Sequence, residues 1–204
     1  MQKVRMRAWS VSVIIVLVLI IDQVIKFWVK TTMSLGEEFK ITEWFRIHFI
    51  ENKGMAFGMD FIGTWPLTLF RVMAVALFIY LLVKIVKKPE RYPFGLAICL
   101  AFVIAGAAGN IIDNCIYGLI FSESTPFNVA MIMDWGTGYA DFMHGKVVDM
   151  FYFPLIDTFW PDWVPLLGGS RFSFFNAIFN FADASISCGS IVLILLYHRF
   201  LFTK

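Results

Sequence analysis

Charged residues are scarce in this sequence. Asp, Glu, Lys and Arg make up 16% of its 204 residues, whereas soluble domains contain roughly 25%. Apolar residues make up 59%, and 23 of them are Phe. This composition is that of an integral membrane protein, and the length suffices for one compact helical bundle. The small net charge of +2 gives no reason to expect a nucleic-acid partner.

The sequence also lacks the common hydrolase and metal motifs. Its three cysteines, Cys99, Cys115 and Cys188, lie in or beside apolar segments without CxxC or zinc-ligand spacing. Such cysteines behave as small hydrophobic residues. HExxH, GxSxG and GxGD are absent, so neither a zinc peptidase nor a serine hydrolase with a nucleophile elbow is indicated. We therefore expect no metal and no cofactor.

Long apolar runs are what the sequence does have. Four are long enough to cross a bilayer, at about 20 residues each: approximately 9–29, 65–87, 94–118 and 174–201. The first is too long for a cleaved signal peptide, contains Asp22 and Lys26, and lacks a small-residue cleavage site. We predict an all-α integral membrane protein, a single domain over residues 1–204 with four transmembrane helices.

The distribution of basic residues predicts the topology. Three precede the first run and four lie around the turn between the second and third, whereas residues 119–173 contain six acids and two bases. The positive-inside rule places both termini and the 88–93 turn in the cytoplasm. The 30–64 and 119–173 loops then face outward. Alternating β-branched and aromatic residues at 39–52 predict short strands there.

Several polar residues within the apolar runs share one depth. Asp22 lies 15 residues beyond Arg7, and Asp183 lies 15 residues before His198, so each is about 22 Å along its helix from that end. The corresponding heights are about 20 Å for Arg71, about 25 Å for Asn110 and about 30 Å for Asp113. In a hydrocarbon core of about 30 Å, these groups from four helices meet in the outer third.

Most of these residues, taken singly, have a structural explanation. Asp22 and Lys26 form an i, i+4 ion pair, Asn110 joins helices, Asp113 ends a helix, and Arg71 reaches toward lipid phosphates. Asp183 is different, because its own segment offers no basic partner nearby. A carboxylate at membrane depth costs roughly 2.5–3.5 kcal/mol. Asn180, three residues earlier in FNFADASI (179–186), is expected on the same helix face.

A second acid lies in the loop before the last run. Asp149 precedes an apolar strip in HGKVVDMFYFP (144–154), and a strip of this kind can return to the membrane and bring Asp149 against Asp183. His144 is a candidate base, although no Ser or Cys nucleophile accompanies it, and an ordinary loop histidine is the simpler interpretation. Two facing carboxylates that share a proton can activate water and polarise a carbonyl group.

Five blocks, in order along the chain, resemble those of the lipoprotein signal peptidase (signal peptidase II) family. They are DQVIK (22–26), ENKGMAFG (51–58), AGAAGNIIDN (105–114), KVVDMF (146–151) and FNFADASI (179–186). The resemblance implies a monomeric aspartic endopeptidase of the bacterial inner membrane, active toward the outer leaflet. It implies cleavage of prolipoproteins before the diacylglyceryl-modified cysteine, with membrane lipid as a further partner.

The same resemblance implies roles for individual residues. The catalytic pair falls on Asp149 and Asp183. Supporting or substrate-binding positions fall on Asp22, Lys26, Asn52, Gly54, Gly106, Asn110, Asp113 and Asn180.

The chain departs from the family pattern at three places. Asn114 stands where the family usually has Arg, and Arg171 or Lys146 are candidates to supply that cation. Ala105 replaces the first glycine of the usual GGxxGN block. Asp113 and Asp149 are 36 residues apart, far more than in compact members of the family, and the role of this extra length is left open.

Two other functions are compatible with some of these features. A proton- or ion-coupled carrier also uses paired acids within the membrane. The structured loops, the polar groups confined to one leaflet and the lack of an inverted repeat argue against it. A catalytically silent signal-peptide-binding protein would be expected to lose one acid of the pair, and both are present.

Overall fold

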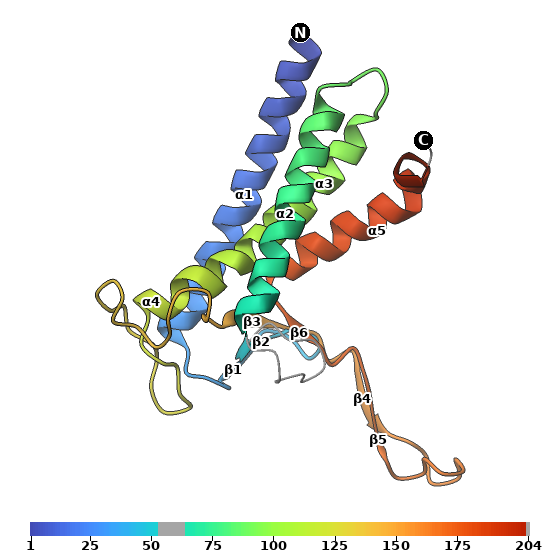
Figure 1. Cartoon of the computed structure of the whole chain (residues 1–204). Helices are drawn as coiled ribbons and strands as arrows, with labels where there is room; N and C mark the ends of the chain where they lie inside the picture. Colours follow the sequence, from blue (N-terminus) through green and yellow to red (C-terminus); the bar gives the residue numbers. More distant parts are fainter. Residues whose placement is uncertain (53–63, 203–204) are drawn as a thin grey trace.

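The computed structural model describes residues 1–52 and 64–202, and its long elements are helices (Figure 1). They are α1 (Gln2–Thr32), α2 (Thr64–Val86), α3 (Phe94–Ile112) and α5 (Phe181–Phe202). A π-helical turn (Asp113–Tyr117) and the short α4 (Gly118–Ile120) continue α3. Four of these helical segments are long and apolar enough to cross a membrane. The predicted class, a four-helix membrane protein with short strands, is confirmed.

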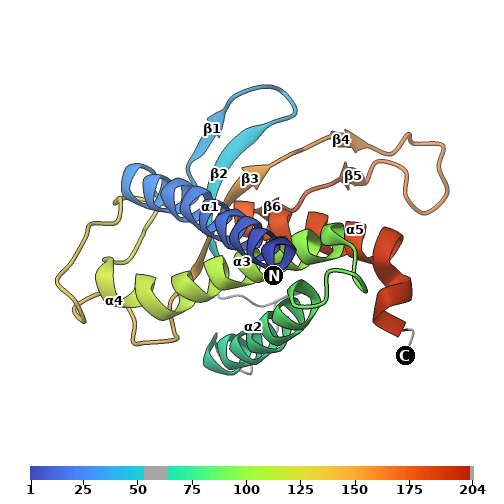
Figure 2. The same ribbon diagram turned by 90° about the horizontal axis from the view of Figure 1, so that it is seen from above.

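Helix α3 is the centre of the bundle and packs against α1, α2 and α5. Figure 2 shows it lying between α1 and α2. Its approach to α5 depends on Gly106, because a Cβ there would lie 2.3 Å from the carbonyl oxygen of Ala182. Gly109 is equally constrained, since a Cβ would lie 2.6 Å from Oδ2 of Asp22. Small residues allow this close helix packing in membranes.

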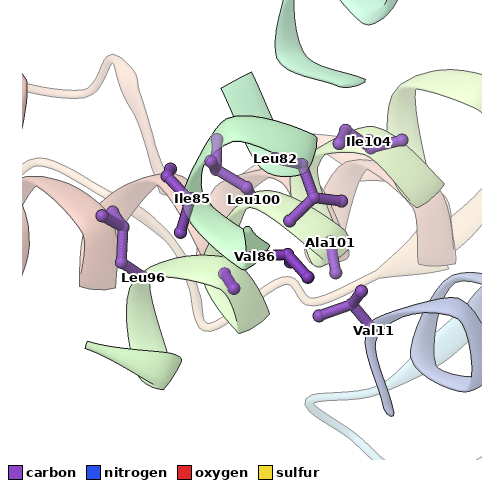
Figure 3. Close-up of a cluster of buried hydrophobic side chains, with 9 residues drawn as sticks. Val11, Leu82, Ile85, Val86, Leu96, Leu100, Ala101 and Ile104 are labelled. Atoms are coloured by element: carbon purple, nitrogen blue, oxygen red, sulfur yellow. The ribbon is translucent and has the colours of Figure 1, made fainter. Parts of the chain in front are cut away.

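The half of the bundle nearest the chain termini is held together by aliphatic side chains (Figure 3). We call this set the apolar cluster: Val11, Leu82, Ile85, Val86, Leu96, Ala97, Leu100, Ala101 and Ile104, from α1, α2 and α3. All nine are buried. Its packing fixes how these three helices lie against one another.

Two small sheets lie at the opposite end of the bundle from the chain termini (Figure 1). An antiparallel sheet has the order β1 (Glu38–Lys40), β2 (Arg46–Asn52), β3 (Val147–Tyr152) and β6 (Ile178–Phe179). The predicted strands within 39–52 are confirmed. A separate hairpin, β4 (Ile156–Phe159) with β5 (Arg171–Phe174), projects away from the bundle.

The last helix begins later than the sequence predicts. The apolar run was expected to be helical from residue 174, but α5 starts at Phe181. Residues 178–179 instead form β6 and pair with Phe151 and Tyr152 of β3. Asn180 then ends the strand and caps the helix. Asp183 therefore lies in the first turn of α5, not inside a long helix.

Candidate active site

The first turn of α5 is held by polar side chains. The amide of Asp183 donates to Oδ1 of Asn180 at 2.8 Å, and the amide of Asn180 lies 3.5 Å from Oδ2 of Asp183. This reciprocal arrangement is a capping box, which satisfies helix amides that have no intrahelical acceptor. The amide of Ala182 donates to Asp22 of α1 at 2.8 Å. The carboxylate of Asp183 thus lies at the positive end of the helix dipole.

Asp149 reaches the same place from the middle strand β3. Its side chain is buried, with 2% exposed, and its Oδ1 accepts a hydrogen bond of 2.6 Å from Nδ2 of Asn180. Asn52, at the end of β2, also hydrogen-bonds Asp149. Burial first, and the charge of Asp183 second, raise the pKa of Asp149 from 3.8 to about 7. Asp183 is therefore close enough to Asp149 for its charge to disfavour the ionised form of Asp149.

Lys26 of α1 is the main cation beneath this pair and is fully buried. Its ammonium group lies 3.0 Å from Asp22 and 2.8 Å from Asp113, and donates to Oδ1 of Asn110 at 2.8 Å. The expected ion pair between Asp22 and Lys26 is present, but it is part of a larger arrangement that joins α1 to α3. A buried lysine with three oxygen partners has a partner for each of its three ammonium donors.

Asn110 connects this cation to the aspartate pair. Its Oδ1 accepts from Lys26, and its Nδ2 donates to Oδ1 of Asp183 at 2.8 Å. Asn180 also donates to Oδ1 of Asn110, at 3.2 Å. The cation therefore orients the Asn110 amide, and the amide in turn presents a donor to Asp183.

We call the joined residues the polar cluster: Asp22, Lys26, Asn110, Asp113, Asp149, Asn180 and Asp183. They come from α1, α3, β3 and α5. The depth estimate from helical rise brought most of them together correctly. Gly106 supports the cluster from α3 through its contact with α5, whereas Gly54 lies outside the described residues.

Gln23 belongs to the same arrangement and was not singled out from the sequence. Its Nε2 donates to Asp113 at 2.9 Å and to Asp22 at 3.1 Å, and its Oε1 accepts from the hydroxyl of Tyr117. The amide of Val148 also donates to Asp113, at 3.3 Å. A polar residue beside Asp22 in an apolar run was the available signal. Asp113 thus ties α3 to the strand that carries Asp149.

The cation near Asn114 is supplied by α2. Arg71 donates to Oδ1 of Asn114 at 2.9 Å and interacts electrostatically with Asp183 and Asp149. Lys146, one of the two candidates from sequence, instead contacts Glu51 and Glu123. Asn114 itself is buried and donates to the carbonyl of Gly145 at 2.7 Å. The contact between Arg71 and Asn114 could not be predicted from the sequence, because the two residues lie on different helical segments.

His144 does not join the site. It is exposed, and its Nδ1 lies 3.0 Å from the carbonyl oxygen of Phe142. Among the described residues, no three His, Cys, Asp or Glu side chains are grouped so that they could hold a metal ion. The arrangement thus brings together two carboxylates, those of Asp149 and Asp183, which are held by asparagine amides near a buried cation.

This chain is similar to several known proteins. The family model for signal peptidase (SPase) II matches residues 14–199. A lipoprotein signal peptidase of Porphyromonas gingivalis is 50% identical over 189 residues, covering 93% of this chain and 83% of the relative. Another, from Amoebophilus asiaticus, is 32% identical over 195 residues, covering 93% of this chain and 78% of the relative.

A solved structure shares the fold. It is a bacterial membrane enzyme determined by the in meso method at 2.3 Å resolution, 24% identical in sequence, with a TM-score of 0.58. The match covers 96% of this chain and 92% of that chain.

Proposed function

This chain belongs to the signal peptidase II family, and on that premise we propose that Asp149 and Asp183 are its catalytic pair. Members of the family are membrane peptidases that remove signal peptides from prolipoproteins, which favours this function over an ion-coupled carrier. The observation that carries the residue assignment is that Asn180 contacts both carboxylates. Its Nδ2 donates to Asp149 of β3 at 2.6 Å, and its backbone amide lies 3.5 Å from Oδ2 of Asp183 on α5.

In the proposed mechanism, the pair shares one proton. The ionised carboxylate takes a proton from water as the water oxygen attacks the scissile carbonyl carbon. The protonated carboxyl group donates to the carbonyl oxygen. When the tetrahedral intermediate collapses, the C–N bond breaks and the leaving amine receives a proton from the pair. The apparent pKa values belong to the pair, so neither role is tied to one residue.

The asparagine residues give this pair its geometry. Asn180 donates to Asp149, Asn110 donates to Asp183, and both asparagines are buried. Donors fixed by neighbouring groups do not need to reorganise during the reaction. Asn52 has an amide that, beyond its contact with Asp149, can pair with the backbone of an extended substrate.

A groove in the half of the bundle nearer the chain termini suits the hydrophobic helix of a signal peptide. It has a volume of about 580 Å³ and runs between α2 and α5, with α3 as its floor. Phe78 and Leu81 line one side and Leu193 and Ile194 the other. The groove lies toward the chain termini, whereas the aspartate pair lies at the sheet end. A helix in this groove would direct its outer end toward Asp149 and Asp183.

We further propose the orientation expected from the sequence. Both termini lie in the cytoplasm, the aspartate pair lies toward the outer leaflet of the inner membrane, and the acyl chains of the substrate cysteine stay in lipid. This orientation is supported by the position of the aspartate pair, which lies at the opposite end of the helices from the chain termini (Figure 1). Reporter fusions at residues 45 and 135 are expected to be exported, and fusions at 89 and 204 to be cytoplasmic. An exported carboxyl terminus would contradict the proposal.

The function is tested with purified monomeric protein and a diacylglyceryl-modified prolipoprotein. We expect a smaller product whose new amino terminus is the modified cysteine. The matched control is the same preprotein without the lipid, which is expected to be cleaved poorly or not at all. Equal cleavage rates for the two substrates would contradict a lipid-dependent site, and lack of cleavage of both would contradict the proposed function.

A further inference from the structure

A second buried charge cluster lies beside the site. Lys30 of α1 is fully buried and pairs with the carboxylate of Glu51 on β2. The hydroxyl of Ser124 accepts from Lys30 at 3.0 Å and donates to Glu51 at 2.9 Å. Lys146 lies 3.2 Å from Oε2 of Glu51. Two lysines thus converge on one carboxylate whose side chain is only 2% exposed.

The segment between Asp113 and Asp149 closes this cluster. The ring of Tyr139 lies under both ammonium groups, 5.0 Å from Lys30 and 5.2 Å from Lys146. Its hydroxyl accepts from the amide of Lys146 at 2.7 Å. Such cation–π contacts gain strength when water is excluded. The segment between Asp113 and Asp149 therefore supplies three of the groups around Glu51, namely Ser124, Tyr139 and Lys146. Tyr139 lies in the extra length that the sequence left without a role.

Glu51 is directly connected to the aspartate pair through the strand. Its chain neighbour Asn52 hydrogen-bonds Asp149. In the sheet, Glu51 lies opposite Val148 and Asn52 lies opposite Val147, directly after an irregularity between Ile47 and Ile50. An irregularity of this kind interrupts the ladder and bends the strand, and a slip of one residue would turn the Asn52 side chain to the other face.

We propose that Lys30, Glu51 and Lys146 form a positioning device that fixes the end of β2 and so holds Asn52 against Asp149. This inference rests on the proposed catalytic role of Asp149. The ion pairs lock Glu51 between α1 and the 121–146 segment. The locked strand leaves Asn52 one register, in which its side chain meets the catalytic carboxylate.

The three charges are not equivalent in this device. Removing Glu51 leaves Lys30 buried without its counter-ion, which is costly in a dry environment. Removing Lys30 leaves Glu51 still paired with Lys146. We therefore expect the loss of Glu51 to have the larger effect and the loss of Lys30 an intermediate one.

The test compares Glu51→Gln, Asn52→Ala and the double variant in cleavage of lipid-modified prolipoprotein. We expect Glu51→Gln to lower kcat by about tenfold to a hundredfold, the scale of a small misplacement of a catalytic group, with little change in KM. The hydrogen bond from Asn52 stabilises the ionised form of Asp149. Its loss raises the pKa of Asp149, so the alkaline limb of the pH profile moves to higher pH in both single variants.

The double variant and a matched control show whether Glu51 acts through Asn52. The double variant is expected to be no slower than Asn52→Ala alone, because Glu51 acts through Asn52. Glu123→Gln removes an exposed partner of the same Lys146 and should leave kcat and the pH profile unchanged. If Glu51→Gln does not fold, Lys30→Met takes its place, with a smaller pH shift in the same direction expected.

A wild-type kcat and pH profile in folded Glu51→Gln or Lys30→Met would overturn the proposal, because a merely stabilising ion pair moves only the melting temperature. Additive losses in the double variant would overturn it as well. Asp149→Asn is measured in parallel. If Asp149→Asn keeps its activity, the proposed catalytic role of Asp149 is wrong. If Asp149→Asn is inactive but Glu51→Gln behaves as the wild type, only the positioning proposal is wrong.

Discussion

The two ends of the helical bundle are built from opposite kinds of contact. At the end near the chain termini, the apolar cluster packs Val, Leu, Ile and Ala side chains against one another (Figure 3). At the sheet end, the polar cluster joins the same α1 and α3 through charged and amide groups. Both clusters are buried, and the proposed catalytic pair lies in the polar one.

The two ends differ in how well they tolerate amino-acid substitutions. Aliphatic packing is non-directional, so swaps that conserve volume usually cost less than about 1.5 kcal/mol. Each group in the polar cluster instead has specific partners, and removing one leaves the others buried and unsatisfied. The apolar cluster therefore acts as the support, and the polar cluster is the part whose individual atoms decide activity.

The largest contrast is expected between the aspartate pair and any residue of the apolar cluster. Asp149→Asn or Asp183→Asn should each remove nearly all turnover, because an amide cannot exchange a proton with water. Both should still fold and capture prolipoprotein, since neither change adds charge to the membrane. Cleavage and capture are measured side by side. Near wild-type turnover in either variant would rule that residue out.

Lys26→Met should damage the stability of the polar end most. It leaves Asp22 and Asp113 buried without their shared cation, and breaking a buried pair in this way costs about 3–5 kcal/mol. Thermal unfolding in detergent measures the loss. Lys3→Met is the matched control, since Lys3 forms an exposed pair with Glu90 and such pairs contribute little. Equal melting temperatures for the two variants would contradict the account.

Leu82→Ala tests the apolar end. It removes a buried side chain of the apolar cluster that does not line the proposed groove. It should cost about 2–5 kcal/mol of stability, with Leu82→Met costing less than about 1.5 kcal/mol. At a temperature where the variant is folded, the cleavage rate per folded molecule should stay near that of the wild type. If the cleavage rate falls by more than the fraction of folded protein does, the packing of the apolar end also affects the site, and the distinction between the two ends is wrong.

The smallest expected effect is a pH-dependent change in the melting temperature of Asp149→Asn. Burial raises the pKa of Asp149 from 3.8 to about 7, so its contribution to stability is full below pH 3.8 and is lost as pH rises through 7. Asp149→Asn should therefore melt higher than the wild type at pH 8, with the advantage shrinking toward pH 5. A melting temperature advantage that grows toward low pH would contradict the raised pKa.

The sequence predicted the parts of the site that depend on helical rise. Asp22, Asn110 and Asp183 come together because the rise per residue is nearly constant, so positions on different helices can be compared. It could not predict where α5 begins. There Asn180 could either continue an apolar helix or end a strand and cap the next element, and the pairing of β6 with β3 decides between them.

Helical rise predicts which residues share a depth, but not which particular side chains contact one another across helices. Nothing in residues 71 and 114 indicates that Arg71 meets Asn114, because helix rotation about its own axis is set by packing. Gln23 was missed for the same reason. The blocks that resemble a known family located Asn52 and Asp149, which periodicity alone placed only in an outward loop.

The most direct test of the aspartate pair is single-turnover cleavage of lipid-modified prolipoprotein by Asp149→Asn, Asp183→Asn and the double variant. Groups that act as one unit are strongly non-additive. We therefore expect the double variant to be only slightly slower than either single variant, at every pH where the protein is folded. A double variant whose loss equals the product of the two single losses would show that the two acids act independently, and would contradict the shared-proton mechanism.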